Sequence, residues 1–337
     1  MSRAERIVDN LNRALHQVMA DDPSVHVLGE DIVDPYGGAF KVTKGLSTRY
    51  GSRVMATPLS EGGIVGVGAG LALAGDKAIV EIMFADFAGL AFDQLLNFAS
   101  KSTMMYGRRV EIPLVVRCPT GGGRGYGPTH SQSLQKHFIG IPGLSVFEMS
   151  PFHDARELLP HLLSLGEPCL LFEDKVLYTR RAYQRGEVDE LFTYDLVGPP
   201  PYVARVRLDD GPPPDCTLIA PGGVAHRAIS AMRALLLNDE ITCQLLVPSR
   251  LYPFDPGPLL PLLEGTRHVC VAEESAAGGT WGSEVAHRLH RHLWGSLPQP
   301  VSVVHSAPDV VPTALHLERD VLIQDTTIRE AVLEALA

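Results

Sequence analysis

The sequence predicts an α/β protein of two domains, each built on a largely parallel sheet with helices on both faces. Short apolar runs alternate with helix-period segments from end to end, which is typical of parallel sheets covered by helices. The alternation fails once, in a proline-rich stretch, and then resumes. At 337 residues the chain is long enough for two hydrophobic cores.

The first half opens with an amphipathic helix at 3–20, on which Ile7, Leu11 and Val18 share one face. Further helices are expected near 61–74, 87–105 and 154–165. Between them, short apolar runs predict strands at 25–28, 54–56, 78–82, 112–116 and 169–172.

The alternation stops between about 183 and 215, where GPPPYV and DDGPPPDC place prolines in two clusters. Proline removes backbone donors and blocks helix continuation, so we expect a Pro-rich linker at 186–214 between domains at 1–185 and 215–337. In the second domain, strands are expected at 217–220, 241–247, 268–272 and 301–305, and helices at 223–237, 278–293 and 326–336.

Composition excludes several classes of function. A net charge of −10 argues against non-specific nucleic-acid binding, and no apolar run reaches the ~18 residues of a membrane span. The mixed charges of MSRAERIVDNLNRAL do not resemble a signal peptide. Five cysteines without a CxxC pattern support neither a disulfide framework nor a zinc site. We therefore expect a cytoplasmic protein that binds neither nucleic acid nor membrane.

Two glycine-rich segments are candidates for function. In TPLSEGGIVGVGAGLALAG (57–75), Ser60 is a suitable N-cap and the helix dipole would favour Glu61 in the first turn. Its glycines do not form a GxGxxG fingerprint, so close helix packing explains them better. In CPTGGGRGYGPTHSQS (118–133), five glycines lie between Gly121 and Gly127. That segment is either a disordered surface loop or a mobile active-site wall ending in His130.

Aromatic residues gather in EIMFADFAGLAFDQLLNFASK (81–101), which contains Phe84, Phe87, Phe92 and Phe98. Most of them are expected in a helix core. One at a strand end could instead stack on a flat cofactor ring.

Several motifs in order resemble one known family, the E1 β subunits of pyruvate, branched-chain 2-oxoacid and acetoin dehydrogenase complexes. They are GEDIVDPYGGAFKVTKGL (29–46), RVMATPLSE (53–61), EIMFADFAGLAFDQ (81–94), GPTHSQSL with PGL (127–144), RLYPFD (250–255) and AEESAAGGTWGSEVA (272–286). The resemblance implies a transketolase-like pyrimidine-binding domain followed by a transketolase C-terminal-like domain.

The same resemblance implies roles for individual residues. Glu61 would hydrogen-bond the aminopyrimidine of thiamine diphosphate, Phe87 would stack on that ring with Met83 nearby, and His130 would be a proton donor during acyl transfer. A potassium site formed by main-chain carbonyls would lie near Leu114, Leu162, Leu163, Leu165 and Glu167.

The resemblance also implies partners. The GDG…N motif that binds diphosphate and Mg²⁺ is missing, since the chain offers only Gly75–Asp76–Lys77. In the family an α subunit holds both groups, so we expect an α₂β₂ heterotetramer that is inactive without α. The acyl unit would pass to the lipoyl group of an E2 component.

Two departures from the family leave the reaction's outcome open. Gly140 stands where a histidine is frequent, and His137 stands where an aromatic is usual. The alternatives are a split-subunit, non-oxidative carboligase or transketolase-like enzyme, and a non-catalytic scaffold subunit. Glu61, Phe87 and His130 count against the scaffold, because an inactive subunit has no physical need for them.

Overall fold

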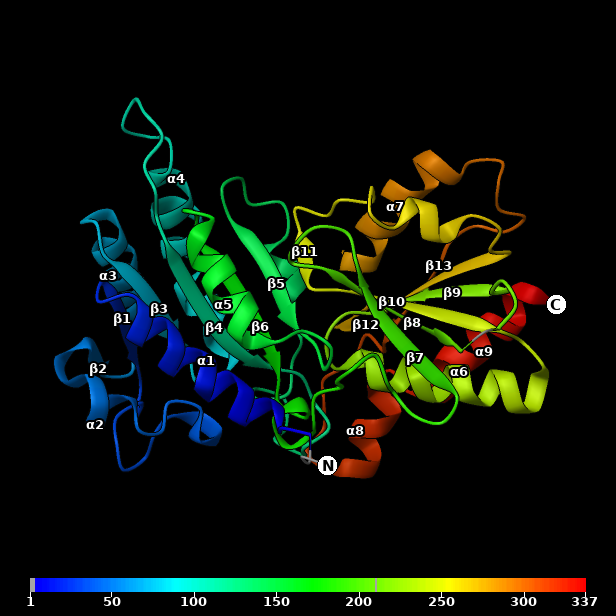
Figure 1. Cartoon of the computed structure of the whole chain (residues 1–337), viewed down its shortest axis with the longest axis horizontal. Helices are drawn as coiled ribbons and strands as arrows, with labels where there is room; N and C mark the ends of the chain where they lie inside the picture. The colour runs from blue at the N-terminus through cyan, green and yellow to red at the C-terminus, as the bar shows by residue number, and fades with distance from the viewer. Residues whose placement is uncertain (1–3, 210) are drawn as a thin grey trace. The chain divides into compact units, whose positions relative to one another are not determined.

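The computed structural model describes residues 4–209 and 211–337, and the chain packs as two compact units (Figure 1). The first unit holds the chain up to Thr120, with Phe138–Met149 and His153–Ala182. The second unit holds Gly121–His137, Ser150–Phe152 and Tyr183–Ala337.

The first unit is a parallel sheet with helices on both faces. Its strands run in the order β5-β6-β4-β3-β1-β2, and every pair among them is parallel. They are β1 (Val25–Gly29), β2 (Val54–Ala56), β3 (Lys77–Glu81), β4 (Leu114–Thr120), β5 (Ser145–Met149) and β6 (Cys169–Asp174). The helices are α1 (Ile7–Asp21), α2 (Leu46–Tyr50), α3 (Glu61–Leu73), α4 (Ser100–Ser102) and α5 (Ala155–Ser164).

Alternation along β3 decides which helix covers which face. Ile79 joins a core cluster with α1 and α5, whereas the next residue, Val80, faces α3. A Cβ atom added at Gly68 of α3 would lie only 2.6 Å from Cγ2 of Val80. Successive strand residues point to opposite faces, so the close packing predicted for the α3 glycines is confirmed at Gly68.

The expected helix at 87–105 is wrong as a single element. The chain forms a 3₁₀-helix at Ala85–Ala91, a π-helical stretch at Gln94–Ala99 and one α-turn, α4. This stretch is pressed against α3: a Cβ at Gly62 would lie 3.1 Å from the carbonyl oxygen of Leu90. The four phenylalanines of 81–101 are half-buried rather than core residues.

The second unit carries a mixed sheet in the order β13-β12-β9-β10-β8-β7. The neighbouring pairs from β13 to β10 are parallel, whereas β8 is antiparallel to both of its neighbours, β10 and β7. The strands of this sheet are β7 (Phe192–Val197), β8 (Val203–Leu208), β9 (Cys216–Ile219), β10 (Cys243–Pro248), β12 (His268–Ala276) and β13 (Ser302–Ser306), and β11 (Arg250–Tyr252) is not one of them. The helices of the second unit are α6 (Val224–Asp239), α7 (Trp281–Leu293), α8 (Leu315–Val321) and α9 (Asp325–Leu336).

The α/β class is confirmed, but the structure differs from the expected division in two places. The segment 186–214, predicted as a linker, contributes β7 and β8 to the second sheet. Its prolines lie between the strands and after them, so the strands keep their hydrogen-bond donors. The segment 121–137 packs with the second unit instead of the first. The exact domain limits at residues 185 and 215 stay predictions.

All five cysteines are free and buried. Within the described residues, no helix has both the length and the apolar character needed to cross a bilayer.

Candidate active site

Glu61 lies at the carboxyl edge of the first sheet, as the first residue of α3. β2 ends at Ala56, and a short loop leads from it into the helix. The Glu61 side chain is 7% exposed, at a helix end whose dipole favours a carboxylate. Ser60 takes the N-cap position as expected, but its side chain makes no capping hydrogen bond.

A second carboxyl group, Glu30, lies at the same edge and was not singled out from the sequence. It directly follows β1, the neighbour of β2 in the sheet. Glu30 is 5% exposed, and its Oε1 atom has no hydrogen-bond partner among the described residues. Burial raises the pKa of Glu30, and the nearby charges of Glu61, Asp31 and Glu81 raise it further. An acid placed directly after a buried apolar strand was the available signal.

Met83 and Phe87 follow β3, on the other side of β1. Both side chains are half-buried. The ring of Phe87 meets that of Phe84 edge-on, with centroids 6.5 Å apart. Because β2, β1 and β3 are parallel neighbours, Glu61, Met83 and Phe87 share one edge of the sheet. A buried acid and an aromatic face fit a flat, protonatable heterocycle.

A buried ion cluster spans the strands beside this edge. Arg117 of β4 donates to Glu81 of β3 at 2.7 Å and to Glu173 of β6 at 2.8 Å. Tyr178 donates to Glu173 at 2.5 Å. Burial raises the pKa of Glu81 although Arg117 opposes the shift. Glu81 also accepts from the backbone amide of Ala39, at 3.3 Å, which ties the GGAFK segment to the cluster.

His130 belongs to the second unit, in a different unit from Glu61. The glycine-rich loop (121–127) that precedes it is anchored: Gly122 donates to Glu274, and Gly123 and Gly125 donate to Glu318. The interpretation as a disordered surface loop is therefore wrong.

The His130 side chain is half-buried, and its Nδ1 lies 3.0 Å from Oγ1 of Thr129. Farther on, His137 lies in a short helix, where burial and then Lys136 lower its pKa. Gly140 has a φ of +89°.

Four of the five residues predicted to bind potassium lie in or just after the last turn of α5, and the fifth, Leu114, begins β4. Leu162 and Leu163 lie in the last turn of α5, and Leu165 is its C-cap. The amide of Ile112, just before β4, donates to the carbonyl of Gly166 at 2.9 Å. The carbonyl of Leu162 accepts from the amide of Leu165 at 3.3 Å, but a carbonyl oxygen has two lone pairs and hard cations prefer oxygen ligands. These donors fit a cation, although the potassium site stays a prediction.

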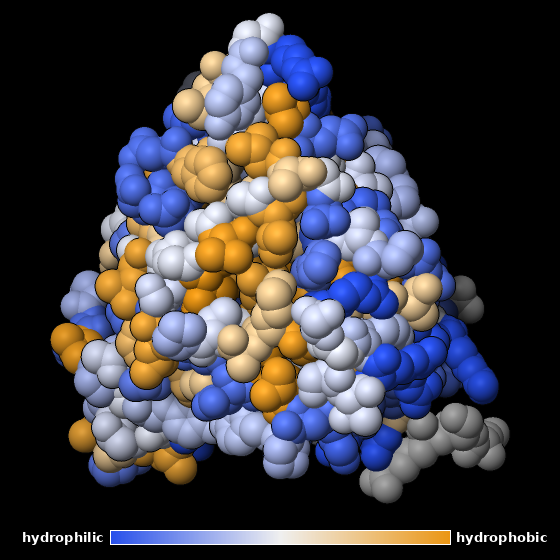
Figure 2. Space-filling view, turned by 90° about the vertical axis from the view of Figure 1, so that its left-hand side faces the viewer, coloured by the Kyte–Doolittle hydropathy of each residue, from blue (hydrophilic) through white to orange (hydrophobic). Residues whose placement is uncertain are grey.

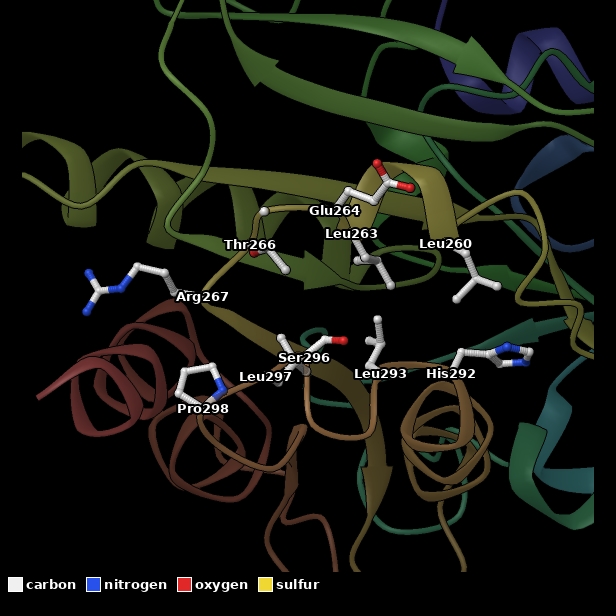
Figure 3. A pocket seen from close by; sticks show the side chains of 11 residues that line it. Leu260, Leu263, Glu264, Thr266, Arg267, His292, Leu293, Ser296, Leu297 and Pro298 are labelled. Atoms are coloured by element: carbon white, nitrogen blue, oxygen red, sulfur yellow. The ribbon is translucent and has the colours of Figure 1, made fainter.

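The second unit also has a pocket, which is lined by other residues (Figure 3). It encloses about 640 Å³ between Leu260, Leu263, Leu293 and Leu297, with Arg267 and His292 at its ends. Arg267 immediately precedes β12, so the pocket lies at the amino end of that strand. Ligand sites of open α/β sheets lie at carboxyl ends, and no predicted site residue lines this pocket.

Comparison with known proteins covers most of the chain. The family model "Transketolase, pyrimidine binding domain" matches residues 6–181, and "Transketolase, C-terminal domain" matches 205–328. The acetoin:2,6-dichlorophenolindophenol oxidoreductase subunit beta of Cupriavidus necator is 33% identical, over 94% of this chain and 93% of its own length.

Two further relatives carry related names. The 2-oxoisovalerate dehydrogenase subunit beta of Bacillus subtilis is 34% identical over 97% of both chains. The pyruvate dehydrogenase E1 component subunit beta of Gracilaria tenuistipitata var. liui is 33% identical, over 96% of this chain and 97% of its own. A solved structure titled "Split gene transketolase, inactive beta4 tetramer" superposes with a TM-score of 0.70 over 97% of both chains at 20% identity, which shows the shared fold.

Proposed function

The chain belongs to the transketolase-like family of 2-oxoacid dehydrogenase E1 β subunits, and from this premise we propose its reaction. Together with an α subunit it decarboxylates a 2-oxo acid on thiamine diphosphate and transfers the acyl group to the lipoyl group of an E2. The observation that carries the proposal is the shared edge of β2, β1 and β3, where the buried carboxyl of Glu61 accompanies the aromatic ring of Phe87.

The side chains of this edge bind and orient a pyrimidine ring and manage its proton. Thiamine diphosphate, when bound, supplies the nucleophilic carbon and the electron sink. Phe87 offers its face to the ring, with Met83 beside it. Glu61 holds and moves the proton at a ring nitrogen. Glu30, whose pKa is raised by burial and by neighbouring carboxylates, is a second carboxyl group at the same edge of the sheet.

His130 serves the second half of the reaction. Opening the lipoyl dithiolane requires a proton at the departing sulfur, and an imidazole near neutral pH can supply one. His130 follows the glycine-rich loop. Because hydrogen bonds to Glu274 and Glu318 anchor that loop, they restrict the position of His130.

The remaining groups come from a partner. Within the described ranges, no cluster of three or more His, Cys, Asp or Glu side chains could hold a metal ion. We assign the diphosphate and its Mg²⁺ to an α subunit because the sequence offers only Gly75–Asp76–Lys77 in place of the GDG…N motif. Figure 2 shows apolar side chains gathered in a band on a face of the first unit. Leu59, Val67 and Leu90 are large exposed hydrophobics of that unit, at 81%, 55% and 66%, and such exposure favours a protein interface.

Calorimetry tests the division between subunits. The purified chain is titrated with thiamine diphosphate and Mg²⁺, alone and after co-purification with an α chain that carries the GDG…N motif. We expect the chain alone to bind thiamine diphosphate weakly and to decarboxylate nothing. With α, we expect tight binding and decarboxylation. Micromolar affinity together with turnover by the isolated chain would overturn the proposal.

A further inference from the structure

The glycine-rich loop (121–127) has a backbone that only glycine adopts readily. Gly121, Gly123, Gly125 and Gly127 have φ values of +86°, +81°, +68° and +80°. This alternation lets neighbouring amides converge on an anion, as in the backbone nests that bind phosphates. Here the anions are carboxylates of the protein itself. Gly123 and Gly125 donate to the two oxygens of Glu318, each at 3.0 Å.

Both carboxylate oxygens of Glu318 accept hydrogen bonds from amides of this loop. The side chain, on α8, is completely buried, and in the described part of the chain no cation pairs with it. A buried carboxylate is costly unless donors compensate it, and charge-assisted bonds from backbone amides are strong. The loop amides and Glu318 therefore satisfy one another.

Glu274 binds the start of the loop and also Ser133, which lies beyond the loop's end. Its Oε1 accepts from the amide of Gly122 at 2.8 Å and from Oγ of Ser133 at 3.0 Å. Its other oxygen pairs with Arg227 at 2.6 Å. Burial alone would raise the pKa of Glu274, but Arg227 and these donors bring it below its ordinary range.

The chain around α8 also backs the loop sterically. A Cβ at Gly122 would lie 2.4 Å from Cδ1 of Leu322, and one at Gly127 would lie 2.6 Å from Oγ1 of Thr313. The loop therefore has little room to move toward α8. His130 lies three residues after Gly127, and its amide donates to the carbonyl of Gly127 at 3.2 Å.

We propose that Glu318 is a positioning residue for His130. Its carboxylate holds the glycine-rich loop through the amides of Gly123 and Gly125, and the held loop determines the position of the His130 imidazole for proton transfer. The proposal rests on the proposed function for the role of His130, whereas the anchoring of the loop rests on contacts within the second unit alone. A misplacement of about 1 Å can cost about 100-fold in rate, so the effect on His130 chemistry should be measurable.

The test compares Glu318→Gln with Asp320→Asn, an exposed neighbour on α8 that loses the same charge, in reconstituted αβ enzyme. Glu318→Gln keeps the volume but loses one of two acceptor oxygens. Trypsin cleavage after Arg124 reports release of the loop. We expect faster cleavage and acylation of a lipoyl domain slowed about 10- to 100-fold, with decarboxylation to an artificial acceptor largely kept. Asp320→Asn should leave all three unchanged.

A double mutant links the two residues. In a His130→Ala background, Glu318→Gln should slow acylation little further, because the positioned group is already gone. Effects that multiply, or wild-type cleavage and acylation in Glu318→Gln, would overturn the proposal. If Glu318→Gln fails to assemble, Glu318→Asp, which withdraws the carboxylate from the amides, is judged by the same readouts. Should wild-type enzyme acylate no lipoyl domain, the proposed function fails, while trypsin cleavage still decides whether Glu318 holds the loop.

Discussion

Glu61 and Glu30 place two carboxyl groups in nearly dry surroundings at adjacent strand ends. Glu61→Gln keeps the shape of the side chain but removes the group that accepts the ring proton. We expect proton exchange at C2 of thiamine diphosphate in the αβ enzyme to slow by about 10²- to 10⁴-fold. The control is Glu157→Gln, an exposed first-turn acid of α5. Exchange as fast as in the wild type would reduce Glu61 to an ordinary helix N-terminal acid.

Glu30 predicts a dependence of stability on pH. Its pKa in the folded chain is raised, so folding favours the protonated form, and stability falls as pH rises from the ordinary value near 4.5 through the folded value. Glu30→Gln removes that loss. The variant should be more stable than the wild type at pH 8, and the difference should shrink at pH 4. Thermal unfolding at both pH values measures the difference, and an equal gain at the two would contradict the assignment.

At the scale of elements, Arg117 ties β4 to both of its neighbours, β3 and β6. Arg117→Met would leave the carboxylates of Glu81 and Glu173 buried without their cation. The free energy of unfolding should drop by about 3–5 kcal/mol, as measured by urea unfolding. Arg109→Met, at an exposed position, should change it by less than about 0.5 kcal/mol. Near-wild-type stability of Arg117→Met would mean that the cluster is not a structural tie.

Local patterns predicted some elements well and others not at all. β2 and α3 begin where expected, because an apolar run and a first-turn acid mark them locally. The antiparallel strands β7 and β8 were missed, since the prolines around them dominate the pattern. The partners of the glycine-rich loop could not be predicted either: Glu274 is 152 residues from Gly122 along the chain, and Glu318 is 195 from Gly123. Only folding brings them together.

At the scale of the whole molecule, the candidate groups are divided between units. Glu61, Met83 and Phe87 belong to the first unit and His130 to the second. The resemblance assigned these four by motif, and the structure adds Glu30 to the first unit. Under the proposed function, an α subunit supplies the groups that bind the cofactor phosphates and the metal, and we expect the choice of 2-oxo acid to depend on both chains.

Mass spectrometry of a lipoyl domain tests the central claim most directly. The co-purified αβ enzyme is incubated with thiamine diphosphate, Mg²⁺, a panel of 2-oxo acids and a lipoylated E2 domain. We predict that the domain gains the mass of one acyl group with a 2-oxo acid of the panel, and that the chain without α acylates nothing. An enzyme that converts the same acids and an added aldehyde into a hydroxyketone, while leaving every lipoyl domain unmodified, would contradict the account and favour the non-oxidative carboligase.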